Sequence, residues 1–216
     1  MIDLHIHSTA SDGSFPPLEI LALAKDAGVR AISLTDHDSI AGIKEIQENI
    51  SQYPMEFITG VEISCEPPKA FKGIGSVHLL GYGFSVYDRR LNQVLQQAVR
   101  SRNERNPKII ERLNELGIDI SLAEVAERFG ADQTGRPHIA ELMKEKGIVK
   151  SFGEAFDIYL GKDKPAYVEK FKISCEEAIQ IILEAGGLPV LAHPGLLEFN
   201  RSRGLESFVD VLVGFG

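Results

Sequence analysis

The stretch Ala31-Ile-Ser-Leu-Thr-Asp-His-Asp38 joins a short apolar run to three consecutive ionisable residues. Such a run is typical of a buried β-strand, with the ionisable residues in the loop at its carboxyl end. Before it, a helical pattern begins after Pro16-Pro17 and stops at Gly28, a residue favoured just past a helix end. Residues 2–7 alternate apolar and polar side chains, which predicts a strand ahead of that helix. The order strand, helix, strand predicts an α/β fold with a parallel sheet.

The alternation of strands and helices continues along the chain. We expect further strands at residues 57–63, 77–82 and 188–192, and further helices at residues 40–50, 174–185 and 205–213. From about Asp88 the strand signals stop, and three or four helical patterns follow. Two of these patterns open with the spacing of a capping box, at Ser121-x-x-Glu124 and Ser151-x-x-Glu154. The middle of the chain is therefore predicted to be all-helical.

These patterns predict an α/β domain that is interrupted by a helical insertion. We place the first part of the domain at residues 1–98, the insertion at 99–168 and the second part at 169–216. The last predicted helix ends in Gly214-Phe-Gly216, where the earlier units place the glycine before a new strand. We therefore expect that the chain stops before the last strands of the domain.

Composition and charge limit the possible functions. The 216 residues are 44% hydrophobic and 25% charged, as in ordinary globular proteins. The net charge of −8 argues against binding long duplex nucleic acid through bulk charge. The sequence has neither an 18-residue apolar stretch nor a signal peptide, which predicts a cytoplasmic protein without a membrane partner. Cys65 and Cys175 are too few for a disulfide scaffold, so we expect two buried thiols.

Candidate metal ligands gather on predicted strands and at strand ends. His5 and His7 lie two residues apart on a strand, which puts both imidazoles on one face. Glu62 interrupts an apolar run, where a carboxylate is costly unless it is paired or bound to a metal. Each candidate alone has an ordinary explanation, such as turn chemistry for Asp12 or core packing for His78. Their shared positions favour one joint site, with the ligands His5, His7, Asp12, His37, Glu62, His78 and His193.

The donor types of this set indicate which ions it suits. Neutral imidazoles and carboxylates together suit divalent transition metals such as Mn, Zn or Fe. The seven candidate ligands exceed the number that one ion takes, so we expect two or three ions. Bound cations would create a local positive field that attracts phosphate to an otherwise acidic protein.

The motifs that carry these residues resemble those of a known family. They are Asp3-Leu-His-Ile-His-Ser8, Ser11-Asp12-Gly13, Leu34-Thr-Asp-His-Asp38, Gly60-Val-Glu62, His78 and Ala192-His-Pro194. Together they resemble the PHP (polymerase and histidinol phosphatase) superfamily. The resemblance implies a distorted, TIM-like (β/α)₇ barrel whose trinuclear metal centre cleaves phosphoesters by attack of a metal-bound hydroxide, with no catalytic side chain beyond the ligands. The family takes its last ligands from an Asp-x-His motif after a further strand, and no such motif follows His193.

The helical insertion carries a second resemblance. Arg102-Asn-Glu-Arg105 and Gly135-Arg-Pro-His-Ile-Ala140 resemble the subgroup of nucleoside 3′,5′-bisphosphate phosphatases and 5′→3′ exonucleases of short RNA. The resemblance implies a phosphorylated small molecule or short nucleic acid as substrate, and it leaves the oligomeric state open. An exposed, solvated helix face is the alternative for the arginines of the first motif. The implied substrate-binding residues are Arg102, Asn103, Arg105, Arg136 and His138.

The sequence thus predicts a metal-dependent phosphoric ester hydrolase. Two alternatives stay open at this point. One is a small-molecule phosphatase of the histidinol-phosphate type, and the other is a degenerate, non-enzymatic metal-binding module.

Overall fold

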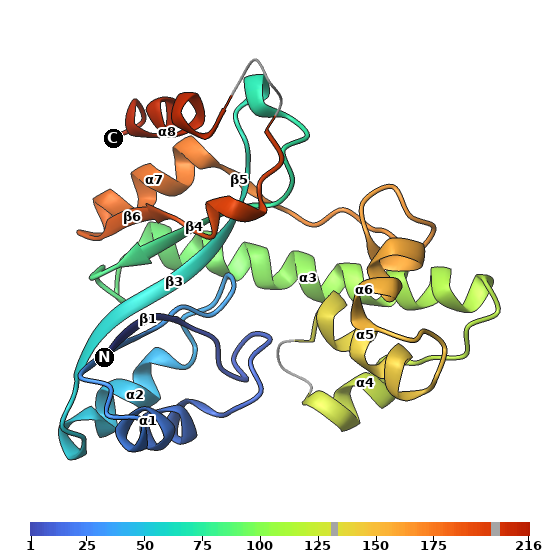
Figure 1. The fold of residues 1–216 in the computed structure, drawn as a ribbon, viewed down its shortest axis with the longest axis horizontal. Helices are drawn as coiled ribbons and strands as arrows, with labels where there is room; N and C mark the ends of the chain where they lie inside the picture. Colours follow the sequence, from blue (N-terminus) through green and yellow to red (C-terminus); the bar gives the residue numbers. More distant parts are fainter. Residues whose placement is uncertain (131–133, 200–203) are drawn as a thin grey trace. The chain divides into compact units, whose positions relative to one another are not determined.

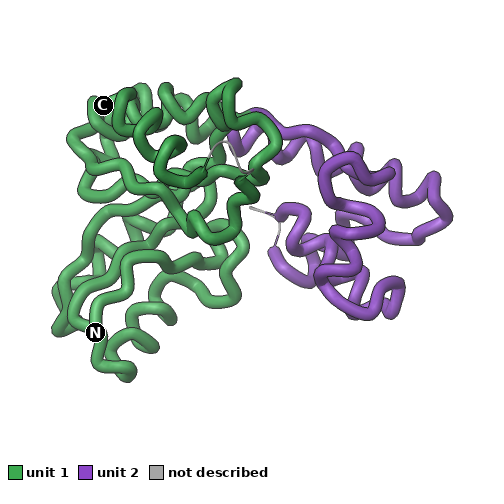
Figure 2. Tube along the Cα trace, turned by 45° about the horizontal axis from the view of Figure 1, so that its top comes forward, with its two compact units in different colours: residues 1–96, 172–216 green, residues 97–171 purple. Residues whose placement is uncertain are grey.

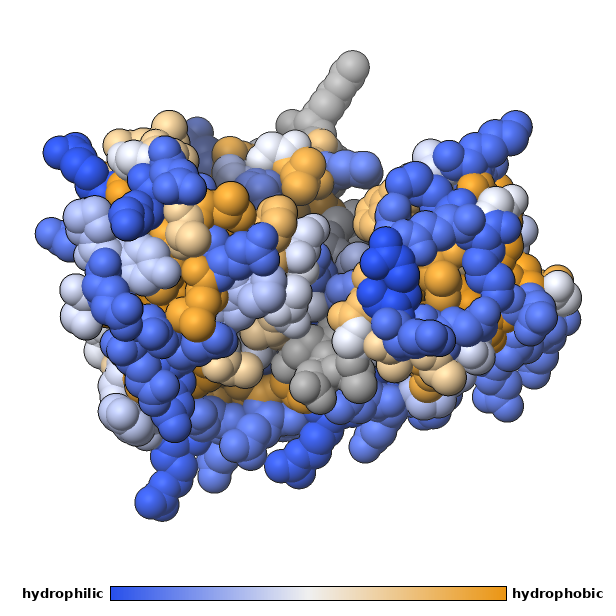
Figure 3. Space-filling view, turned by 90° about the horizontal axis from the view of Figure 1, so that it is seen from below, coloured by the Kyte–Doolittle hydropathy of each residue, from blue (hydrophilic) through white to orange (hydrophobic). Residues whose placement is uncertain are grey.

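The computed structural model describes residues 1–130, 134–199 and 204–216. The chain forms two compact units, one made of Met1–Gln96 with Lys172–Gly216 and the other of Gln97–Phe171 (Figure 2). The predicted insertion, residues 99–168, falls inside the second unit. On the face that Figure 3 shows, hydrophilic side chains cover much of the surface, and apolar patches lie between them. None of the described helices combines the length and the apolar character needed to cross a bilayer.

The first unit contains a mixed sheet, and every predicted strand is present in it. Its pairing order is β1-β2-β3-β4-β6, and β5 pairs with β3 (Figure 1). β1, β2 and β3 are parallel neighbours, which confirms the parallel arrangement expected for this part of the chain. The strands are β1 (Ile2–Ile6), β2 (Ala31–Leu34), β3 (Glu56–Glu66), β4 (Val77–Tyr82), β5 (Ile173–Ser174) and β6 (Leu188–Leu191).

Helices cover the sheet of this unit. Side chains of α1, α2 and β2 share one core cluster that includes Leu21, Ile32 and Ile46. Gly28 follows the end of α1 with a φ of +68°, a conformation that glycine adopts without strain. The helices are α1 (Pro17–Asp26), α2 (Ile43–Asn49), α7 (Cys175–Glu184), α8 (Leu205–Val213) and the start of α3 (Arg89–Glu115), with 3₁₀ turns at Ile50–Gln52, Lys69–Phe71 and Pro194–Leu196.

The direction of β4 differs from the sequence prediction of a parallel sheet. β4 runs antiparallel to both of its neighbours, β3 and β6. Residues 67–76, which join β3 to β4, are fewer than the dozen or so that a parallel crossover needs, so the chain turns straight back. The reversal moves the start of β4, including His78, to the edge where β1, β2 and β3 have their carboxyl ends. His78 therefore reaches the expected edge from the amino end of its strand.

The long strand β3 changes its pairing partner at Gly60. Residues Glu56 to Thr59 pair with β2, and residues Gly60 to Cys65 pair with β4. A Cβ atom at Gly60 would lie 2.1 Å from the Oγ atom of Ser33, so only glycine allows β2 to approach β3 this closely. This close approach fixes the position of Glu62, two residues further along β3.

The second unit is helical and has its own hydrophobic core. Ile109, Val125, Ile139 and Met143 are buried in it. Ser121 and Glu124 form the predicted capping box at the start of α4. Ser151 accepts a hydrogen bond from the backbone N–H of Glu154, as expected at a helix start. The unit contains most of α3, α4 (Leu122–Phe129), α5 (Arg136–Glu145), α6 (Phe152–Ala155) and a π-helix (Phe156–Leu160).

Candidate metal centre

Glu62 is the central residue of a cluster in the first unit, and only 1% of its side chain is exposed. Its Oε2 atom lies 3.0 Å from Nε2 of His5 and 3.0 Å from Nε2 of His7. The same oxygen lies 3.4 Å from Nδ1 of His37, which follows β2. One carboxylate oxygen thus meets imidazoles from two segments that are thirty residues apart in sequence.

The second oxygen of Glu62 meets two more imidazoles. Oε1 lies 3.0 Å from Nδ1 of His78 and 2.7 Å from Nε2 of His193. Asp12 completes the cluster, since its carboxylate oxygens lie 3.3 Å from Nδ1 of His7 and 3.7 Å from Nε2 of His37. The structure therefore brings all seven predicted ligands together.

The loop after β1 is folded so that Asp12 returns to His7. The backbone N–H of Gly13 donates to the carbonyl oxygen of Ser8 at 2.9 Å. A Cβ atom at Gly13 would lie 2.1 Å from the carbonyl oxygen of His7, so a larger residue would open the loop. This tight turn holds the Asp12 carboxylate beside the His7 ring.

Asp36 has a positioning role that the sequence pattern does not reveal. It is buried and accepts three hydrogen bonds, from the N–H and Oγ of Ser8 and from the Oγ of Ser11. Burial raises the pKa of Asp36, although the hydrogen bonds from both serines oppose that rise. Asp36 therefore anchors the loop that carries Asp12 to the end of β2.

Asp38 anchors β3 in a similar way. Its carboxylate accepts from the N–H of Ser64 at 2.8 Å and from the Oγ of Ser64 at 3.2 Å. Its own N–H donates to the carbonyl oxygen of Glu62 at 2.9 Å. Asp38 has a φ of +54° and His193 a φ of +29°, values that cost energy in non-glycine residues and cluster at functional sites.

The electrostatics of the cluster keep Glu62 ionised. Burial by itself raises the pKa of Glu62, but hydrogen bonds from His7 and His78 lower it well below its usual range. Burial lowers the pKa of His37 to about 4, so its ring is neutral at pH 7. Burial by itself lowers the pKa of His7. The hydrogen bond to Glu62 and the charge of Asp12 outweigh that effect, so the pKa of His7 is raised overall. A neutral imidazole beside a carboxylate is the form in which both groups bind metal ions.

The donor atoms of the cluster fit divalent transition metals. They form three overlapping groups, namely His5 with His7 and Glu62, His7 with Asp12 and His37, and His37 with Glu62 and His78. The ligand atoms within each group lie within 4.8 Å of one another. The buried Nδ1 atom of His193 has no hydrogen-bond partner in the part of the chain that the structure describes. Nitrogen and oxygen donors that converge at such distances are typical of a metal centre.

The predicted substrate-binding residues lie in the second unit. Arg102 and Arg105 on α3 are only 6% and 5% exposed, so the interpretation of an exposed helix face is wrong for both. Asn103 lies between them on the exposed side. The sequence prediction missed Asn106, which is buried and donates to the carbonyl oxygen of Thr134 at 2.6 Å.

Arg136 and His138 open helix α5. The Nη1 atom of Arg136 donates to the carbonyl oxygen of Leu160 at 2.9 Å. The Nδ1 atom of His138 accepts from the backbone N–H of Gly135 at 3.0 Å, which satisfies one of the free N–H groups at the helix start. A role of these two residues in substrate binding stays a prediction.

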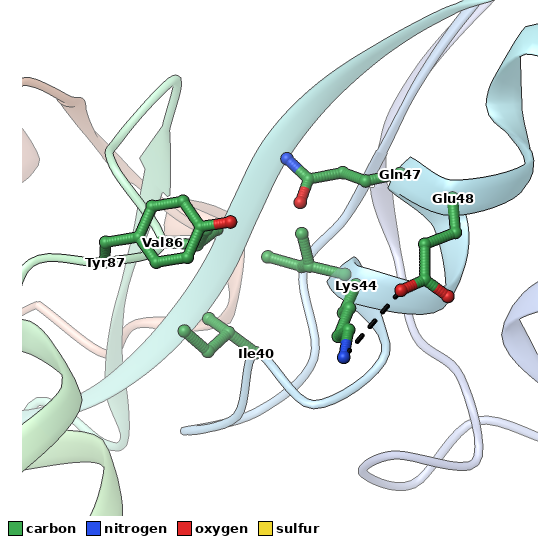
Figure 4. A pocket seen from close by; sticks show the side chains of 7 residues that line it. Ile40, Lys44, Gln47, Glu48, Val86 and Tyr87 are labelled. Atoms are coloured by element: carbon green, nitrogen blue, oxygen red, sulfur yellow. Dashed lines mark ion pairs between the residues drawn. The ribbon is translucent and has the colours of Figure 1, made fainter.

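A separate hollow lies on the first unit, away from the predicted site residues. Its volume is about 490 Å³, and an ion pair between Lys44 and Glu48, 3.8 Å long, lies in its wall. Figure 4 shows Ile40, Val86 and the ring of Tyr87 around the same hollow. None of the seven candidate ligands lines it.

Comparisons with known proteins agree with the geometry of the cluster. The family model described as PHP domain matches residues 3–185. A 5′-3′ exoribonuclease of Haemophilus influenzae is 36% identical over 93% of this chain and 70% of its own length. A 3′,5′-nucleoside bisphosphate phosphatase of Chromobacterium violaceum is 32% identical over 93% of this chain and 69% of its own length. The chain thus spans about 70% of the length of these curated relatives.

A solved structure has the same fold. It is described as an amidohydrolase from Chromobacterium violaceum with bound sulfate and no metal. Its TM-score to this chain is 0.88 at 30% sequence identity, and the match covers all of this chain and 74% of the other.

Proposed function

The chain belongs to the PHP domain family, and on that premise we propose that it hydrolyses a phosphate ester of a nucleoside 3′,5′-bisphosphate or of the 5′ end of a short RNA. The observation that carries this proposal is the convergence of five histidines on the single buried carboxylate of Glu62. Nitrogen and oxygen donors that converge in this way are typical of a site that holds divalent cations. The two curated relatives, which act on nucleotide phosphates by name, support the same substrate class.

We propose that the cluster holds two or three divalent ions of Mn, Zn or Fe. The three overlapping groups of donors support more than one ion, because a single ion takes four to six ligands. When bound, the ions would polarise the phosphoryl oxygens and lower the pKa of the attacking water. The ligands would be His5, His7, Asp12, His37, Glu62, His78 and His193.

The chain's own residues would set the geometry around those ions. Glu62 would supply its two oxygens as ligands beside the ring nitrogens that now contact them. Asp36 and Asp38 would keep the loops after β1 and β2 in place through their bonds to serine. Groups held in this way need no rearrangement when the substrate binds, and such preorganisation lowers the barrier to reaction.

The arginines of the second unit would recognise the substrate phosphate. Guanidinium groups bind phosphate through two parallel hydrogen bonds, and Arg102, Arg105 and Arg136 are held in place by burial or by contacts. Asn103 and His138 would add polar contacts. The net charge of −8 favours short phosphorylated ends over long nucleic acid.

Hydrolysis by the purified protein tests this proposal directly. The protein is loaded with Mn²⁺ and given adenosine 3′,5′-bisphosphate, a short 5′-phosphorylated RNA, the same RNA with a 5′-hydroxyl, and histidinol phosphate. We expect turnover of the first two substrates and little of the others. The double variant His5→Ala/His7→Ala is the control, and it should lose both metal and activity.

Other outcomes would identify the alternatives. Preferential turnover of histidinol phosphate would favour the small-molecule phosphatase. Turnover that survives the loss of His5 and His7 would contradict the role of the cluster. A protein that binds one ion or none and turns over no phosphate ester would be the degenerate module.

A further inference from the structure

The guanidinium group of Arg136 contacts two aromatic rings of the second unit. Its Cζ atom is 5.7 Å from the centre of the Phe156 ring and 5.3 Å from the centre of the Tyr167 ring. Both distances are within the range of cation–π attraction. Its Nη1 atom donates to the carbonyl oxygen of Leu160. We call these three partners, Phe156, Leu160 and Tyr167, the Arg136 socket.

Two of the three partners come from an unusual piece of backbone. Phe156 and Leu160 are the first and last residues of a π-helix, a rare turn that is frequent at functional sites. The N–H of Gly161 donates to the carbonyl oxygen of Phe156 at 2.8 Å and ends this turn. A Cβ atom at Gly161 would lie 2.5 Å from the same oxygen, so the turn depends on glycine. The π-helix thus presents a ring and a carbonyl oxygen to one guanidinium group.

Tyr167 is itself held at both ends. Its carbonyl oxygen accepts a hydrogen bond from Arg112, and its N–H donates to the carbonyl oxygen of Lys164. Its hydroxyl group donates to Glu169 at 3.2 Å. The ring that faces Arg136 is therefore fixed by its own contacts.

Most of the hydrogen-bonding capacity of Arg136 remains. A guanidinium group has five N–H donors, and Arg136 gives one of them to Leu160. Within residues 1–130, 134–199 and 204–216, no other acceptor bonds to this group. These remaining donors can bind an anionic oxygen pair, which a planar guanidinium fork matches in geometry.

We propose that the Arg136 socket positions this guanidinium to grip a phosphate group of the substrate, with Phe156 and Tyr167 as positioning residues. The inference rests on the proposed function for the identity of the ligand, a nucleoside bisphosphate. The rings fix the plane of the guanidinium, and Leu160 fixes its rotation. A fork that is already oriented loses less entropy when it binds phosphate than a free side chain does.

Nuclear magnetic resonance of the full chain tests the socket without relying on turnover. In ¹⁵N-labelled protein freed of metal, the Nε–H signal of Arg136 is expected upfield of other arginine signals because two rings flank it. The variant Tyr167→Leu should lose much of that shift, and Tyr167→Phe should keep it. Tyr87→Leu is the matched control, since it removes an exposed tyrosine ring from the first unit.

Titration with adenosine 3′,5′-bisphosphate then tests the positioning role. We expect Tyr167→Leu and Phe156→Leu each to raise Kd about 10-fold, the size of one cation–π contact. Tyr167→Phe and Tyr87→Leu should stay within about 2-fold of the parent protein. Circular dichroism shows whether each variant is folded, and Arg136→Ala still tests the phosphate contact if the leucine variants are unfolded.

Each result separates the socket from the proposed function. If Tyr167→Leu is folded and loses the ring shift but binds the nucleotide like the parent protein, the positioning role is wrong and hydrolysis is unaffected. If Arg136→Ala also binds like the parent protein, the phosphate contact itself is wrong. A protein that shows the ring shift and the Kd changes but hydrolyses nothing supports the socket and contradicts the proposed function.

Discussion

The Glu62 cluster and the Arg136 socket hold charged groups in two different ways. The cluster collects side chains from segments spread between His5 and His193, and their positions depend on the register of the sheet. The socket holds one side chain through contacts with residues 156–167, all in one helical unit. The first arrangement is cooperative, because its five histidines all meet the same carboxylate. The second is local, so we expect its loss to cause a graded effect rather than failure of the whole site.

The largest effect is expected when the central carboxylate of the cluster is neutralised. Glu62→Gln keeps the shape of the side chain but removes the charge that meets five imidazoles. We expect metal content to fall below one ion per chain and hydrolysis to fall about 10³-fold or more, since metal ions supply several kcal/mol of transition-state stabilisation. Elemental analysis and initial rates measure the two effects.

The matched control for this variant is Glu48→Gln. Glu48 is exposed, and its contact with Lys44 is an ordinary surface pair. The control should keep the metal content and the rate of the parent protein. Full metal content in Glu62→Gln would show that the cluster does not depend on its shared carboxylate.

A smaller effect is expected when an anchor of the cluster is changed. Asp36→Asn keeps one acceptor oxygen but weakens the three bonds to Ser8 and Ser11 that hold the loop of Asp12. Outer partners of metal ligands typically contribute 10- to 100-fold in affinity, so we expect Mn²⁺ affinity to fall by about that factor. Titration calorimetry measures it, with the exposed Asp26→Asn as control. Unchanged affinity would mean that the loop holds its position without Asp36.

The sequence predicted the candidate metal ligands, but it did not predict the anchoring role of Asp36 and Asp38. The sequence predicted that His5, His37 and Glu62 lie on strands or at strand ends. This was possible because alternating or apolar runs of residues indicate a strand directly. Asp36 and Asp38 look as much like ligands as His37 does, yet both are satisfied by serine side chains and backbone N–H groups. Those bonds join residues 25 to 28 positions apart, and no local pattern shows such pairing.

The fold was predictable for similar reasons. Strand and helix positions follow from periodicity and caps, and β4 and α8 begin and end at the predicted residues. The reversed direction of β4 was missed because an alternating run reads the same in both directions. The Arg136 socket was missed because a π-helix has no local sequence signature, and because Tyr167 meets Arg136 only after the unit folds.

A third prediction concerns the close approach of strands on which the cluster depends. Gly60→Ala would place a methyl group 2.1 Å from the Oγ of Ser33 and 2.8 Å from the carbonyl oxygen of Leu34. Overpacking of this kind costs about 1–3 kcal/mol, so we expect Tm to fall by several degrees and metal affinity to fall with it. Gly153→Ala is the control, because its nearest neighbour would be 3.9 Å away and alanine favours helices. Thermal unfolding with and without Mn²⁺ separates the two variants.

The smallest effect is expected from a cap in the second unit, and it tests whether the two arrangements are independent. Ser121→Ala removes the hydrogen bond that the Oγ atom of Ser121 accepts from the backbone N–H of Glu124 at the start of α4, which costs about 1 kcal/mol of unfolding free energy. Because the cluster depends on the sheet register of the first unit, the metal affinity of this variant should stay that of the parent protein. A loss of metal affinity as large as that of Asp36→Asn would show that the helical unit is coupled to the cluster. Calorimetric titration of Mn²⁺, beside denaturant unfolding of the same sample, decides between a modular and a coupled chain.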